Sequence, residues 1–243
     1  MIRLKITFVC LVLAISGAQA QDLKGALNKL KTKVSGSTTE LSKEETGKAL
    51  KEALQIGAEE AVAFLAKENG YYESMYKVLL PEEAQKVTAK LKAVPGFANV
   101  EQELILRLNR AAELAAAKAK PIFVNAITGL SFQDALAILM GEKNAATQYL
   151  RTTTSQQLIA EFKPVIAASL DEVKARQYWR DAVTAYNKIP LVTKVSTELD
   201  DHVTNKAMDG LFKLVEVKES KIRTDVSART SDLLRKVFAK QDK

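Results

Sequence analysis

The single histidine of the chain, His202, stands among three acidic residues, Glu198, Asp200 and Asp201. Imidazole and carboxylate groups hold zinc and iron in many proteins, but a catalytic zinc site usually takes three ligands with more than one histidine. A helical di-iron site takes two Glu-x-x-His pairs. The acids also fall where a helix is expected to begin, and a helix N-terminus favours acidic side chains. We therefore expect this cluster to stabilise a helix start, and we predict no metal site.

The sequence motifs of other common catalytic and cofactor sites are absent. The sequence has no G-x-S-x-G turn, no glycine-rich phosphate loop and no dinucleotide-binding G-x-G-x-x-G pattern. Its one cysteine, Cys10, lies in the apolar start of the chain. We predict no catalytic residues and no cofactor, and binding is favoured over enzyme activity. A carboxylate-based hydrolase stays an alternative, because two acids distant in sequence can converge in a fold.

A set of polar residues is predicted to lie beside the apolar faces of helices. Buried charges must be paired, or each costs several kcal/mol. The set either forms a structural network joining the helices or lines a polar, net-basic cleft for an anionic group. The members are Asn109, Arg110, Glu113, Tyr149, Arg151, Lys163, Tyr178, Tyr186, Asn187, Asp209, Arg223 and Arg229.

The first twenty residues have the pattern of a secretory signal. Arg3 and Lys5 precede an apolar run from residue 6 to residue 15, and Ala18-Gln19-Ala20 offers small residues at a cleavage site. The run is shorter than the ~20 residues that a membrane-spanning helix needs. We expect cleavage after Ala20 and a periplasmic or secreted protein whose mature chain contains no cysteine.

Residues 21–39 combine a short amphipathic helix, with leucines on one face and lysines between them, and a Ser/Gly/Thr linker. At most, this segment makes peripheral membrane contact. The formal net charge of the chain is +7, with basic and acidic residues intermixed. The pattern predicts a solvated surface and no nucleic-acid partner.

The remaining residues, 40–243, are predicted to form helices. Proline and glycine are few, and apolar residues recur at helical spacing, as in Leu104, Leu108, Ala111 and Ala115. Expected capping boxes are Ser42 with Glu45 and Thr154 with Gln157; Ser131 caps another helix. Gly70 is expected to end the first helix, and Pro164 to kink or divide a later one. The prediction is an all-α, bundle-like single domain of about eight to ten helices, without significant sheet.

Several segments resemble a known family. They are LKEALQIGAEEAV, LNRAAELAAAKAKPIFVNAI, DALAIL, AATQYLR, FKPVI, YNKIP, VTNKAMDGLFKLV and RTSDLLRKVF. Over roughly Leu41 to Phe238 the chain resembles the bacterial family catalogued as domain of unknown function number 4197. The resemblance implies one exported helical domain in the cell envelope and no established activity, and most of the polar residues above fall in its recurring motifs.

These observations lead to one main functional hypothesis. We expect a non-catalytic envelope protein that binds a small anionic ligand or an envelope protein through a polar, basic cleft. The alternative is a scaffold protein whose exposed helices pack on another envelope component.

Overall fold

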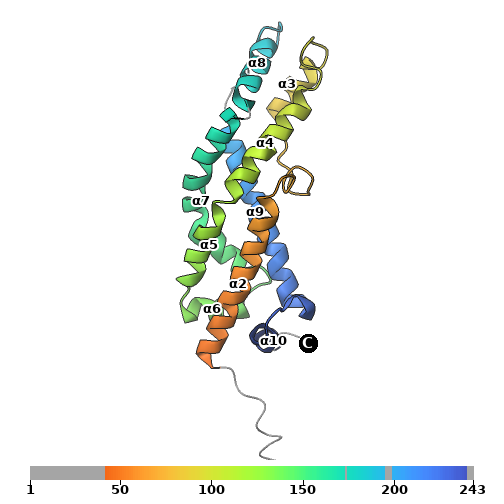
Figure 1. The fold of residues 1–243 in the computed structure, drawn as a ribbon. Helices are drawn as coiled ribbons and strands as arrows, with labels where there is room; N and C mark the ends of the chain where they lie inside the picture. Colours follow the sequence, from red (N-terminus) through yellow and green to blue (C-terminus); the bar gives the residue numbers. More distant parts are fainter. Residues whose placement is uncertain (1–41, 173, 195–198, 240–243) are drawn as a thin grey trace, which may run out of the picture. The chain divides into compact units, whose positions relative to one another are not determined.

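The computed structural model describes residues 42–172, 174–194 and 199–239. The predicted leader and the amphipathic segment at 21–39 lie outside these ranges. The α-helices are α2 (Lys43–Leu65), α3 (Glu82–Leu91), α4 (Val100–Ala116), α5 (Ala119–Thr128), α6 (Phe132–Met140), α7 (Ala145–Glu172), α8 (Ala175–Asn187), α9 (Asp200–Thr224) and α10 (Asp232–Phe238) (Figure 1). The described ranges contain no strand, which confirms the all-α prediction.

Local capping signals set two helix starts as predicted. The Ser42 hydroxyl accepts from the Glu45 backbone N–H at 3.1 Å, and the Glu45 carboxylate accepts from the Ser42 N–H at 2.8 Å. Ser131 and Asp134 form the same reciprocal pair at the start of α6. These bonds satisfy backbone donors that the first turn of a helix leaves unpaired.

The predicted capping box at Thr154 is wrong. Thr154 lies inside α7, which continues from Ala145 through Pro164 to Glu172, and its hydroxyl donates to the Leu150 carbonyl at 2.6 Å. The helix does not divide at Pro164. The reason is a buried stripe at every fourth residue that crosses both positions: Leu150, Thr154, Leu158, Phe162, Ile166 and Leu170. Burial of this stripe outweighs the local signal.

Helix α2 ends at Leu65, five residues before Gly70. Gly70 instead folds the chain back over the last turn of α2, where a Cβ would lie 2.4 Å from the Phe64 carbonyl oxygen. A connector, residues 66–81, then leads to α3. The connector ends at Pro81, the N-cap of α3, so its position determines where α3 begins.

The long helices α2, α4, α7 and α9 supply most of the core, and α7 packs on both α4 and α9. The four alanines in the second half of α4, Ala111, Ala112, Ala115 and Ala116, are buried. Helices α3 and α8 pack together at one end of the helical unit, and α6 and α10 lie at the other (Figure 1).

Within the described residues, no single helix is long and apolar enough to cross a membrane. One bent pair, Val100–Thr128 followed by Phe132–Met140 at 104°, meets the criterion by length and composition.

Candidate functional site

A pocket lies where α3, α8 and α9 meet. Its volume is about 580 Å³, within the range of about 300–1,000 Å³ that small organic ligands occupy. Its wall combines polar and apolar side chains from segments far apart in the sequence. The lining residues are Pro81, Glu83, Ala84, Lys86, Trp179, Tyr186, Thr193, Lys194, Leu199 and His202. We call it the α3/α8/α9 pocket.

Two helices begin at this pocket. Pro81 is the N-cap of α3 and Leu199 is the N-cap of α9, and neither makes a side-chain capping hydrogen bond. Proline and leucine side chains offer no acceptor for the first backbone N–H groups. The positive ends of both helix dipoles reach the pocket wall without a side-chain cap and favour a negatively charged group there. The first-turn acids, Glu82 and Glu83 on α3 and Asp200 and Asp201 on α9, offset part of this positive charge.

The charged side chains of the lining reinforce this preference. Lys86 on α3 and Lys194 in the segment before α9 are both exposed, so their ammonium groups can move toward a bound group. Glu83 is the acidic side chain among the described lining residues. The described wall thus carries a net positive charge at neutral pH.

The back of the pocket is aromatic. Trp179 is 1% exposed and Tyr186 is 6% exposed, both on α8. The Trp179 indole nitrogen Nε1 is buried without a hydrogen-bond partner in the described part of the chain. A buried unpaired donor costs about 1–3 kcal/mol. Trp179 is also the single tryptophan of the sequence, so its fluorescence reports on this pocket alone.

His202 joins the pocket to the connector. Its Nε2 lies 2.8 Å from the Leu79 carbonyl oxygen, and the residue is half-buried. The hydrogen bond ties the first turn of α9 to the residues that precede α3. It therefore fixes the two helix starts relative to each other.

Two of the acidic neighbours of His202 lie at the start of α9, where the sequence predicts a helix N-terminus. Asp200 and Asp201 occupy its first turn. Asp200 is paired with Arg176, and Asp201 lies 2.7 Å from Lys163. Glu198 lies outside the described residues. Across the described ranges, no three His, Cys, Asp or Glu side chains gather closely enough to hold a metal ion.

Of the polar residues singled out in the sequence, Asn109 and Glu113 bind the connector from α4. The Asn109 amide exchanges two hydrogen bonds of 2.8 Å with the backbone of Val78. Glu113 accepts from the backbone N–H groups of Tyr71 and Tyr72 and pairs with Arg110 at 2.6 Å. These bonds hold the segment that leads to the pocket.

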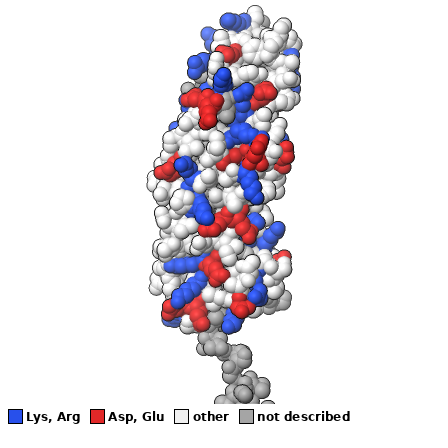
Figure 2. Space-filling model, viewed as in Figure 1, with Lys and Arg blue, Asp and Glu red and all other residues white. Residues whose placement is uncertain are grey.

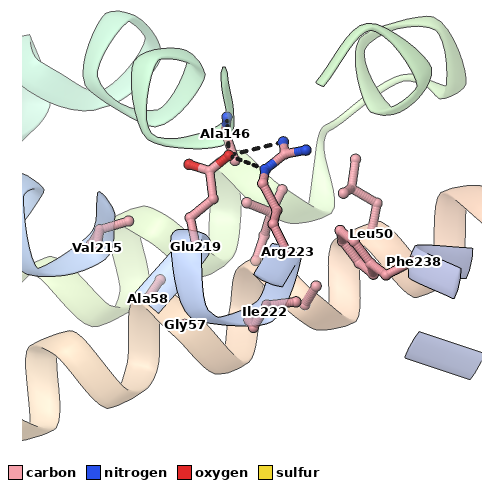
Figure 3. A pocket seen from close by; sticks show the side chains of 11 residues that line it. Leu50, Gly57, Ala58, Ala146, Val215, Glu219, Ile222, Arg223 and Phe238 are labelled. Carbon is pink, nitrogen blue, oxygen red and sulfur yellow. Dashed lines mark hydrogen bonds and ion pairs between the residues drawn. The ribbon is translucent and has the colours of Figure 1, made fainter. Parts of the chain in front are cut away.

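Arg223 and Glu219 form a second buried group, on α9 (Figure 3). Glu219 accepts from the backbone N–H groups of Ala146 and Thr147 and therefore caps α7. Arg223 donates to the carbonyls of Ile138 and Leu139 at the end of α6. The adjacent cavity is small, about 20 Å³, and mainly apolar. This pair joins three helices.

Arg229 is 1% exposed and closes the end of α9. Its guanidinium donates to the Ile222 carbonyl at 3.0 Å and to the Arg223 carbonyl at 3.1 Å. It also lies 5.8 Å from the centre of the Phe238 ring on α10. Arg229 thereby satisfies the last carbonyls of α9 and places the C-terminal helix.

The other predicted residues lie nearer the surface. Arg151 pairs with Asp209 at 3.5 Å and covers the Phe212 ring. The Tyr178 ring lies beneath Arg107 at 5.6 Å. Tyr149 lines a shallow depression of about 200 Å³ next to α6. Lys163 pairs with Asp201, as described above, and Asn187 is the half-buried last residue of α8.

The structure brings one of the twelve predicted residues, Tyr186, into the α3/α8/α9 pocket. Sequence reasoning missed the pocket lysines Lys86 and Lys194, because exposed lysines on a polar helix face carry no distinguishing signal. The ligand-binding role of the twelve stays a prediction. The contacts of Asn109, Glu113, Arg223 and Arg229 are those of a structural network.

On the face shown in Figure 2, basic and acidic side chains are interspersed, as the sequence predicts. Ion pairs among the described residues include Lys218 with Glu60 and Lys120 with Glu59. The net-basic lining of the pocket therefore differs from this mixed surface by its composition and its position at two helix starts.

Comparison with known proteins gives one match. No curated protein and no solved structure is similar enough to match the chain. The sequence profile of a family described as protein of unknown function (DUF4197) matches residues 40–239. The match includes every residue whose structure is described, so the chain belongs to this family.

Proposed function

We propose that this protein is exported to the cell envelope and binds a small organic anion, without catalysis, in the α3/α8/α9 pocket. The observation that carries the proposal is a pocket of about 580 Å³ placed at two helix starts without side-chain caps. Secretion is proposed from the leader pattern of residues 1–20.

The lining suits a ligand with a charged end and a less polar body. The helix starts and the two lysines attract the charge, and Tyr186, Ala84 and Leu199 provide apolar surface. Lys86 and Lys194 act as mobile point charges, so they accept carboxylate, phosphate or sulfonate groups without demanding one geometry. Glycoside hydrolysis would require two carboxylates in one cleft. Among the described lining residues, Glu83 alone carries a carboxylate. This composition supports binding rather than hydrolysis.

The test uses 8-anilino-1-naphthalenesulfonate, an organic anion that fluoresces in apolar surroundings. Excitation of the single tryptophan, Trp179, should transfer energy to the bound dye, because the two lie in the same pocket. The double variant Lys86→Ala/Lys194→Ala should bind the dye about tenfold or more weakly, as expected for loss of two nearby charges.

The matched control is Lys90→Ala/Lys118→Ala, which removes two exposed lysines that do not line the pocket. Its dye affinity should equal that of the wild type. Equal weakening in both double variants would show that the dye responds to net charge, and it would overturn the pocket assignment. Absence of energy transfer from Trp179 would do the same.

A further inference from the structure

We infer that His202 makes ligand capture in the α3/α8/α9 pocket depend on pH, with tighter anion binding as the pH falls. The inference rests on the proposed function and concerns the regulation of the same site. It follows from the hydrogen bond of His202 and from its place in the pocket wall.

The hydrogen bond determines which ring nitrogen of His202 carries the proton in the neutral ring. A carbonyl oxygen can only accept, so the 2.8 Å contact with the Leu79 carbonyl requires a proton on Nε2 of His202. In the neutral ring, Nδ1 is then the nitrogen without a proton. Protonation adds its proton at Nδ1 and leaves the Nε2 bond intact. The pocket therefore gains a positive charge without losing the contact that joins α9 to the connector.

Several charged or titratable groups line the pocket with His202 or lie near it on its own helix. They comprise Glu83 and Lys86 from α3, Tyr186 from α8, Lys194 from the segment before α9, and Asp200, Asp201 and Lys206 on its own helix. Ordinary carboxylates, lysines and tyrosines do not change charge between about pH 6 and about pH 8, whereas an imidazole does. Asp200 and Asp201 are already paired with Arg176 and Lys163. The added charge on His202 therefore meets the ligand as a net increase.

Binding and protonation are coupled in both directions. An anion in the pocket favours the protonated ring, and the protonated ring favours the anion by the same factor. For a charge about 6–8 Å from the ligand in a partly solvated site, the expected gain in affinity is about three- to tenfold.

The experiment measures the affinity of 8-anilino-1-naphthalenesulfonate for the purified protein at about pH 8 and about pH 6, at constant ionic strength. The sulfonate keeps its charge across this range, so a change reports on the protein. The wild type should bind about three- to tenfold more tightly at the lower pH. The variant His202→Gln keeps an N–H donor for the Leu79 carbonyl, and its affinity should be the same at both values.

A second measurement does not depend on the variant. His202 is the single histidine, so its imidazole gives one set of NMR signals. The midpoint of their titration should move to higher pH when the dye is bound. Dye binding that is independent of pH, or an unmoved midpoint, would overturn the role of His202 while leaving the pocket in place. Failure of the dye to bind in the pocket at either pH would instead overturn the proposed function.

Discussion

At the scale of the residue, the buried polar side chains hold backbone groups that the fold leaves without partners. Asn109 pairs with both backbone groups of Val78, which is 1% exposed. Tyr71 shows the same use of a polar group: its hydroxyl donates to the Ala207 carbonyl at 2.7 Å, and burial, followed by the charge of Glu113, raises the pKa of Tyr71. These side chains fix the connector that leads into α3.

Replacement of Asn109 by leucine should therefore destabilise the protein strongly. Asn109→Leu leaves the buried N–H and C=O of Val78 unpaired, at an expected cost of about 2–4 kcal/mol in the free energy of unfolding. Urea denaturation measures the change. The exposed Asn205 provides a control, since Asn205→Ala should stay within about 0.5 kcal/mol of the wild type. A similar small effect for both variants would contradict the role of Asn109.

The structural role of the buried polar residues could be predicted only in part. The periodicity of α4 places Asn109 and Glu113 beside its apolar stripe, and both are indeed buried. The partners could not be predicted, because Asn109 binds backbone atoms 31 positions earlier in the sequence. Backbone groups look the same at every residue, so the sequence carries no signal for such a contact.

At the scale of the element, helix ends explain much of the described structure. Glu219 caps the start of α7, Arg223 caps the end of α6, and Arg229 caps the end of α9. Charged side chains of α9 and of the turn that follows it thereby bind backbone groups at three helix ends. Local signals do act elsewhere, at Ser42 and Ser131, where the capping residues are adjacent in sequence.

The pair formed by Glu219 and Arg223 should be far more costly to break than a surface pair. Arg223→Met leaves a buried carboxylate and two carbonyls without their partner, and about 3–5 kcal/mol should be lost. Thermal or urea unfolding measures this loss. Arg180→Met removes an exposed arginine from α8 and should change stability by less than about 0.5 kcal/mol. Equal stability of the two variants would mean that the pair does not join α6, α7 and α9.

The capping box of α2 should give a distinct response to acid. Hydrogen bonds from the backbone and the side chain of Ser42 lower the pKa of Glu45. A lowered pKa in the folded state stabilises the protein above the ordinary glutamate range, and this contribution is lost as the pH falls through the lowered value. The wild type should therefore be more stable than the variant Glu45→Gln near neutral pH, and the difference in the free energy of unfolding should disappear as the pH falls. A difference that persists at low pH would contradict this account.

At the scale of the whole molecule, the all-α class was predictable, because apolar spacing repeats along the chain. The α3/α8/α9 pocket was not. Its lining runs from Pro81 to His202, and the packing of α3 on α8 is a tertiary contact that helical periodicity does not report. The predicted capping box at Thr154 was wrong for a related reason, because Thr154 belongs to the buried stripe of α7.

The proposed export has a direct consequence for the mature chain. Expression of the full sequence in a bacterial host should yield a periplasmic protein that begins at Gln21, with a mass lower by residues 1–20. N-terminal sequencing and mass spectrometry of the fractionated protein measure this. A protein that keeps Met1 and stays in the cytoplasm would contradict the proposed location, without bearing on the pocket.

The most direct test of ligand binding is native mass spectrometry of the purified protein after incubation with a small-molecule extract of bacterial cells. The account predicts one added mass of an organic anion on the wild type and on Lys90→Ala/Lys118→Ala, and its loss in Lys86→Ala/Lys194→Ala. An added mass that persists in Lys86→Ala/Lys194→Ala, or no added mass on the wild type, would contradict binding of an organic anion in the α3/α8/α9 pocket.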